Sequence, residues 1–156
     1  GVATTFAPFL PAMQAARQQA ALVGVASIAG WRGLPGNGAY CASKAGLIAY
    51  LQSLRAELRP TALSVHTISP GYLRTPLTAG NRFAMPGLLE PDDAAQALLA
   101  GVAAGREHIV LPRRTGWLAR ALMCLPARWH DGLLLKQPRK PRPGEAGATD
   151  IPGLKK

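Results

Sequence analysis

The chain has 156 residues, 48% of them hydrophobic, and its 18 Lys and Arg against 8 Asp and Glu give a formal net charge of +10. This hydrophobic fraction excludes a disordered polyelectrolyte, and about 150 residues are enough for one domain with a core. Pro8 and Pro11 interrupt the longest uncharged stretch, so no run reaches the roughly 18–20 apolar residues of a membrane-spanning helix.

Hydrophobic periodicity predicts helices and strands that alternate along the chain. In chain order these are a helix over 2–19 that the two prolines kink or delay, a strand over 21–26, a helix over 39–59, a strand over 63–69, a helix over 91–105 and a strand over 108–111. This order is typical of an α/β protein with a parallel sheet.

Polar residues that could carry chemistry follow the first two predicted strands. Ser27 comes directly after the first, and Pro70, Gly71 and Thr75 come after the second. Ligands of such sheets bind beyond the carboxyl ends of the strands, so we expect these residues to share one site.

Tyr40 and Lys44 are four positions apart on the predicted helix over 39–59, so their side chains share a face. A free phenol has a pKa near 10 and exchanges protons poorly at neutral pH, but a nearby cation stabilises the phenolate. The spacing predicts Tyr40 as a general acid/base and Lys44 as the cation that tunes it. The pair by itself is also compatible with a solvated helix face, and Ser27 alone with a cap or a turn.

Taken together, the motifs resemble the active-site stretch of the short-chain dehydrogenase/reductase (SDR) family. They are SIAG at 27–30, GLPG at 33–36 and YCASKA at 40–45, with the family's usual spacing from Ser27 to Tyr40. PGYLRT at 70–75 is similar to the segment that closes over the nicotinamide in that family.

The resemblance implies an NAD(P)-dependent oxidoreductase that acts on a carbonyl or alcohol substrate and needs no metal. Tyr40 would be the acid/base, Lys44 would also bind the nicotinamide ribose, and Ser27 would polarise the carbonyl. Residues expected to bind the cofactor are Tyr40, Lys44, Pro70, Gly71, Leu73 and Thr75. The resemblance also implies a homo-oligomer, a dimer or a tetramer.

The family's glycine-rich dinucleotide turn and its catalytic Asn are missing from the sequence. We therefore expect the C-terminal part of a longer protein: the C-terminal half of a Rossmann-like, doubly wound sheet at 1–112, a helical extension at 113–136 and a flexible basic tail at 137–156. Ten of the 18 basic residues lie beyond position 111. Such a tail could contact an anionic surface, or it could only aid solubility; without aromatic residues, nucleic acid is not an expected partner.

The remaining candidates favour structural interpretations. His66, His108 and His130 are scattered, which predicts core or edge positions rather than a ligand set, and Cys41 is expected to pack. Cys41 and Cys124 have neither metal-site spacing nor a disulfide framework, which fits a cytoplasmic protein. The segment 117–135 could be a flap over the substrate pocket, a subunit contact or a weak membrane-surface contact.

Two functional hypotheses stay open at this point. One is an active oxidoreductase of which this chain is the catalytic half. The other is a truncated, non-catalytic interaction module of the same fold that binds surfaces through its basic tail.

Overall fold

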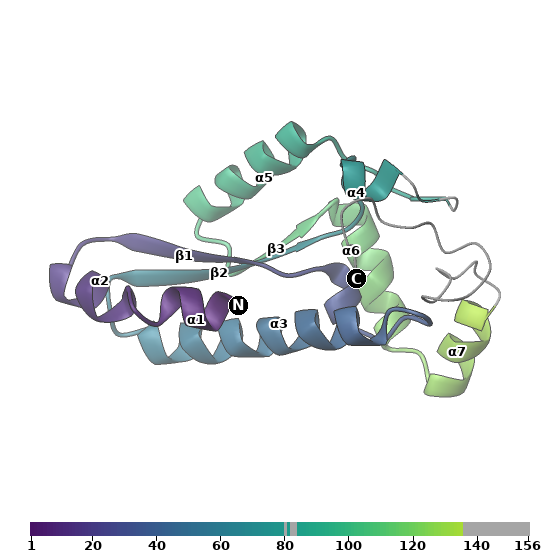
Figure 1. Ribbon diagram of the computed structural model, residues 1–156, viewed down its shortest axis with the longest axis horizontal. Coiled ribbons are helices and arrows are strands. Elements are labelled where there is room, and N and C mark those ends of the chain that lie inside the picture. Colours follow the sequence, from purple (N-terminus) through teal and green to yellow (C-terminus); the bar gives the residue numbers. More distant parts are fainter. Residues whose placement is uncertain (80, 82–83, 136–156) are drawn as a thin grey trace, which may run out of the picture.

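The structure, a computed structural model, describes residues 1–79, 81 and 84–135. A parallel sheet lies at its centre, with strands β1 (Ala20–Val25), β2 (Leu63–Pro70) and β3 (His108–Leu111) in the order β1-β2-β3 (Figure 1). Val25 is in register with Ile68, and Ile68 with Ile109, so the carboxyl ends of the strands meet at one edge. The predicted α/β architecture is confirmed.

Helices cover both faces of the sheet, as expected of a doubly wound fold. Helices α1 (Val2–Phe6), α2 (Leu10–Ala16) and α3 (Gly38–Leu58) lie on one face, and α5 (Pro91–Ala103) lies on the other (Figure 1). The first face buries Leu22, Leu51, Leu54, Leu58, Leu63 and Val65. The second buries Ile68, Ala94, Ile109 and Leu111. The alternation of Val65 and Ile68 between the two clusters explains why β2 is apolar on both sides.

Two predicted helices differ from the observed ones for local reasons. The helix over 2–19 is divided into α1 and α2. Pro8, between them, lacks the N–H group that a continuous helix needs, and Pro11 lies in the first turn of α2, where a proline is tolerated. Helix α5 ends at Ala103, before the predicted end, because Gly105 takes a left-handed φ of 67°. The N–H of Arg106 then donates to the Gly101 carbonyl at 3.0 Å, which closes the helix end and starts the chain toward β3.

The remaining elements lie around the carboxyl edge of the sheet (Figure 1). They are the 3-10 helix η1 (Ile28–Gly30) and the helices α4 (Pro76–Ala79), α6 (Arg113–Met123) and α7 (Ala127–Leu135). Helices α6 and α7 fall in the predicted helical extension, and the predicted tail at 137–156 lies outside the described residues. In the described part of the chain, every helix is too short or too polar to cross a bilayer.

A chain of polar and aromatic contacts ties β3 to α6. The buried Ser69 hydroxyl of β2 hydrogen-bonds Nε2 of His108 at 2.8 Å, and the His108 ring packs edge-on against Trp31 with centroids 5.6 Å apart. The Arg120 guanidinium of α6 lies 5.5 Å from the Trp31 ring centroid. Burial lowers the pKa of His108, and the positive charges of Arg120 and Arg55 lower it further, so this imidazole is neutral in the folded protein at pH 7.

We predict that Leu51→Ala lowers the free energy of unfolding by about 2–5 kcal/mol, the usual range for Leu→Ala in a core. Leu51 is fully buried, and its side chain fills the space beside Gly24 that a β-carbon would occupy. Leu99→Ala on α5 is the control, because Leu99 is 65% exposed. Equal losses for the two variants in urea denaturation would contradict this account of the core.

The position of His108 also predicts a pH dependence of stability. The unfolded chain takes up a proton at the ordinary pKa of 6.5, whereas the folded chain resists protonation until lower pH. The contribution of His108 is therefore present above pH 6.5 and is lost as the pH falls below it. The variant His108→Gln keeps a polar partner for Ser69 but does not titrate. Between pH 7.5 and pH 5.5, the unfolding midpoint of this variant should therefore fall less than that of the unchanged protein. Parallel falls in both proteins would rule out this linkage.

Candidate active site

A cleft of about 640 Å³ opens at the carboxyl ends of β1 and β2. One side is made by the residues that follow the two strands and by the first turns of α3, and the other by α6 and α7. All of the site residues predicted from the sequence line this cleft: Ser27, Tyr40, Lys44, Pro70, Gly71, Leu73 and Thr75. The fold thus brings three separate motifs to one place.

Ser27 lies at the start of η1 and is 8% exposed. Its Oγ accepts a hydrogen bond of 3.1 Å from the Ala29 N–H, so it serves as the cap that a Ser after a strand commonly provides. As an acceptor in this bond, the hydroxyl keeps its own hydrogen available for an oxygen in the cleft. The capping role and a role as donor to a ligand are therefore compatible.

Tyr40 and Lys44 lie one turn apart near the start of α3, as their spacing predicts. The Nζ of Lys44 donates a 3.0 Å hydrogen bond to the carbonyl of Val25 at the end of β1, and it lies 5.8 Å from the Tyr40 ring centroid. The strand end thus fixes the ammonium beside the phenol. Tyr40 itself is half exposed at the cleft, where a ligand can reach it.

A glycine allows η1 to lie against α3. A β-carbon on Gly30 would come within 2.8 Å of the Lys44 carbonyl carbon and 3.0 Å of the Ala45 nitrogen, which are backbone atoms that cannot easily move aside. Ser27 directly precedes η1 and Lys44 lies on α3, so the close approach of η1 to α3 brings the two residues near each other. Gly30 is therefore required for the positions of both residues, although its own conformation is ordinary.

The segment after β2 is fixed by the hydroxyl of Thr78. Its Oγ1 donates to the Leu73 carbonyl at 2.6 Å and accepts from the Thr75 N–H at 2.9 Å. The N–H of Gly71 donates to the Leu111 carbonyl at 2.7 Å, which holds the start of the segment to β3. Burial raises the pKa of Tyr72, the second tyrosine that lines the cleft.

Helices α6 and α7 form one wall of the cleft. In the sequence analysis, a flap over the pocket is one of three options for residues 117–135. The lining residues from this wall are Thr115, Ala119, Leu122, Met123, His130 and Leu134. This position is compatible with the predicted flap, and the subunit contact and the membrane-surface contact stay predictions for the same segment.

Arg32 holds the wall in place and was missed by the sequence analysis. Its Nη1 lies 3.0–3.2 Å from the carbonyl oxygens of Leu122, Met123 and Leu125 at the end of α6. A cation at the carboxyl end of a helix satisfies its unpaired carbonyls and opposes the helix dipole. No local pattern signals this role, because the partners are some 90 residues away in the chain.

The three histidines occupy the core or edge positions that were predicted, and among the described residues no His, Cys, Asp and Glu cluster could hold a metal ion. His66 is buried, with Nδ1 2.8 Å from the Arg106 carbonyl and Nε2 2.9 Å from the Ser64 hydroxyl. His130 is also buried, but it contributes to the cleft lining, which sequence reasoning did not anticipate. Cys41 is buried as expected, and Cys41 and Cys124 are both free thiols.

Comparison with known proteins identifies the relatives of this chain. The sequence model of the short chain dehydrogenases matches residues 1–85. An uncharacterised oxidoreductase of Myxococcus xanthus is 41% identical over 126 residues, which cover 81% of this chain and 49% of that protein. The ketoacyl reductase HetN of Nostoc is 35% identical over 97 residues, 60% of this chain and 33% of that protein.

A similar structure is that of a short chain dehydrogenase from Burkholderia cenocepacia in complex with NADP. It has a TM-score of 0.67 and 25% sequence identity, and the match covers 83% of this chain and 52% of that one. The chain thus spans about half or less of the length of the relatives that it matches.

We predict that Arg32→Gln loosens the wall of the cleft. The shorter neutral side chain cannot reach three carbonyls, so hydrogen exchange of the amides in 119–125 should be at least tenfold faster than in the unchanged protein. Arg59→Gln is the matched control, because Arg59 is an exposed arginine at the end of α3. Unchanged exchange in Arg32→Gln, or equal acceleration in Arg59→Gln, would show that Arg32 does not hold α6.

Proposed function

The chain belongs to the short-chain dehydrogenase family, and from this premise we propose that it is the catalytic half of an NAD(P)-dependent oxidoreductase. In this proposal a hydride passes between the nicotinamide and a carbonyl or alcohol substrate. The observation that carries the proposal is the convergence of Ser27, Tyr40 and Lys44 on one cleft at the carboxyl ends of parallel strands. That edge is where α/β sheets bind their ligands.

The residues present fit the nicotinamide end of such a cofactor. Lys44 uses one of its three N–H groups on the Val25 carbonyl, which leaves two for the hydroxyl groups of a ribose. Pro70, Gly71, Leu73 and Thr75 would line the nicotinamide ring from the segment that Thr78 fixes. When bound, the cofactor would supply or accept the hydride.

The proton would be handled by Tyr40. In the direction of reduction, the phenol O–H gives its proton to the carbonyl oxygen as the carbonyl carbon is reduced, and an alcohol results. The ammonium of Lys44 stabilises the phenolate that remains. Ser27 donates a hydrogen bond to the same oxygen, which orients it and stabilises its developing negative charge. Oxidation of an alcohol is the reverse of these steps.

The lining of the cleft favours a substrate with an apolar body. Apolar side chains come from both sides of the cleft: Ile28, Leu34, Leu73, Leu122, Met123 and Leu134. A carbonyl compound whose reactive oxygen lies near Ser27 and Tyr40 would bury its hydrocarbon part against them, at about 25 cal/mol per Å² of apolar surface. We therefore propose apolar aldehydes, ketones or secondary alcohols as the substrate class. A cytoplasmic dimer or tetramer remains part of the same proposal.

We predict that Tyr40→Phe lowers kcat of the intact protein by about 10²–10⁴-fold, the usual contribution of a general acid. The assay follows NAD(P)H at 340 nm with a series of apolar ketones and aldehydes. Tyr50→Phe is the matched control, because Tyr50 lies on the same helix but packs against the core that α3 forms with the sheet. It should keep the activity of the unchanged protein.

Two results would contradict the proposal. Turnover that persists in Tyr40→Phe would remove Tyr40 from the mechanism. If the unchanged, folded protein turns over none of these substrates with either cofactor, the non-catalytic interaction module is favoured instead.

A further inference from the structure

His130 of α7 is a buried histidine that the proposed mechanism does not use. It is 5% exposed and lines the cleft of the candidate active site. The other two histidines are hydrogen-bonded, His66 through both ring nitrogens and His108 through Nε2. Among the residues that the structure describes, none forms a hydrogen bond with either nitrogen of His130. Buried polar groups are rarely left without a partner, so this ring is suited to a partner from outside the described chain.

The two nitrogens of His130 have different surroundings. Nδ1 is fully enclosed and lies 3.5 Å from Oδ1 of Asp131 without forming a hydrogen bond. Because a carboxylate only accepts hydrogen bonds, its nearness favours the tautomer with the ring hydrogen on Nδ1. Nε2 is not enclosed in this way, so it is the nitrogen that a ligand in the cleft can reach. In that neutral tautomer Nε2 is an acceptor, and the partner that it fits is a hydroxyl group.

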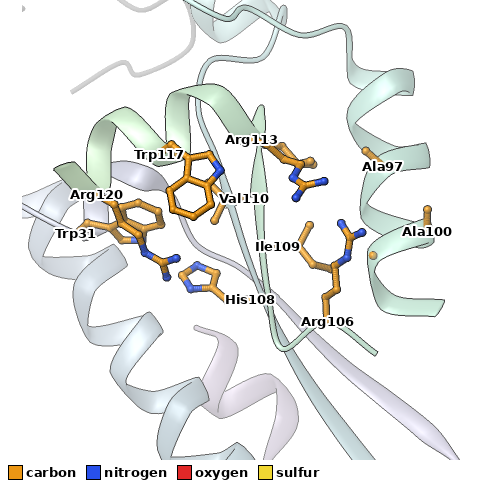
Figure 2. Close-up of a pocket in the computed structure, with 13 residues that line it drawn as sticks. Trp31, Ala97, Ala100, Arg106, His108, Ile109, Val110, Arg113, Trp117 and Arg120 are labelled. Atoms are coloured by element: carbon orange, nitrogen blue, oxygen red, sulfur yellow. The ribbon is translucent and has the colours of Figure 1, made fainter. Parts of the chain in front are cut away.

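The wall that carries His130 has a defined position. Figure 2 shows the Arg120 side chain of α6 beside Trp31 and His108, and its guanidinium lies 5.5 Å from the Trp31 ring centroid. Arg32 binds the carbonyls at the end of α6. Only the connection 124–126 separates that end from α7. A ligand-binding group on a helix held in this way can select a ligand by its geometry.

The surroundings of His130 on this wall are mostly apolar. Apart from Thr115, the other residues of α6 and α7 that line the cleft are Ala119, Leu122, Met123 and Leu134. A hydrocarbon that covers this wall removes water from Nε2 and returns no hydrogen bond, whereas a hydroxyl at the same place replaces that water. The wall therefore discriminates between an apolar ligand and one with a hydroxyl at this point.

We propose that His130 selects substrates that carry a hydroxyl group in addition to the carbonyl or alcohol that reacts. The inference rests on the proposed oxidoreductase function and deepens it, because it narrows the apolar substrate class to hydroxyketones and diols. Nε2 of His130 accepts the hydrogen bond of the additional hydroxyl, while Ser27 and Tyr40 bind the reacting oxygen. His130 is thus a specificity-determining residue and takes no part in the proton transfer.

Matched pairs of ketones test the proposal in the intact protein. Aliphatic ketones with a hydroxyl at increasing distance from the carbonyl are each compared with their O-methyl ether, which cannot donate a hydrogen bond. With NAD(P)H, kcat/KM of at least one hydroxyketone should exceed that of its ether about tenfold, mainly through KM, as expected for one hydrogen bond.

Variants of α7 assign this preference to the imidazole. His130→Phe should bring the two values together, whereas His130→Gln should keep part of the preference, because its amide oxygen can accept the same hydrogen bond. Trp129→Phe is the control on the same helix, since Trp129 is 62% exposed and does not line the cleft. It should keep the ratio of the unchanged protein.

Calorimetry separates this inference from the proposed activity. In the Tyr40→Phe protein, which lacks the proposed acid, the hydroxyketone should still bind about tenfold more tightly than its ether, and an added His130→Phe change should remove the difference. Absence of turnover in the unchanged protein contradicts the oxidoreductase function, whereas equal binding of the two ligands contradicts the role of His130.

Two further results would overturn the inference. One is a preference for the hydroxyketone that survives in His130→Phe. The other is an equal loss for both ligands in His130→Phe and His130→Gln, which would make His130 a structural residue of α7.

Discussion

The hydrogen bond from the Lys44 ammonium to the Val25 carbonyl is the interaction on which the candidate site depends. Val25 is the last residue of β1, and a cation from the adjacent helix donates to its carbonyl. The bond fixes the start of α3 against the end of β1, with Gly30 allowing the intervening 3-10 helix to lie close. As a result Tyr40, Lys44 and Ser27 line the same cleft although they come from a helix and a strand end. The sheet pairing supplies the rest, because it brings the segment after β2 to the same edge.

Helix α6 extends this logic to the opposite wall. Two neighbouring residues hold this helix. Arg32 binds the carbonyls at its carboxyl end, and the ring of Trp31 contacts the Arg120 guanidinium. A helix held in this way cannot shift without disturbing the loop that follows Ser27. The position of this wall of the cleft is therefore linked to the position of Ser27. Gly116 lets the same helix pack tightly on Val110 of β3.

The parts of this arrangement that depend on local spacing could be predicted from the sequence. Tyr40 and Lys44 share a face because they are four residues apart, and Ser27 and Pro70 lie at strand ends because apolar runs stop there. The break at Pro8 was foreseen as a kink, although not as two separate helices. In contrast, the role of Arg32 depends on carbonyls about 90 residues away. It does not follow from a local pattern, since arginine in a loop is also an ordinary solvated residue. His130 shows the same limit: a buried histidine was expected, but which cavity it borders is decided by the path of the chain after α6.

The cations that line the cleft have carbonyl partners rather than carboxylates. With 18 basic and 8 acidic residues, most positive groups cannot have a carboxylate partner. In the described structure the two cations that line the cleft contact neutral groups instead: Lys44 a strand carbonyl and Arg32 helix carbonyls. Such partners hold the cation in position without cancelling its charge, so the field of the ammonium still acts on the phenol beside it.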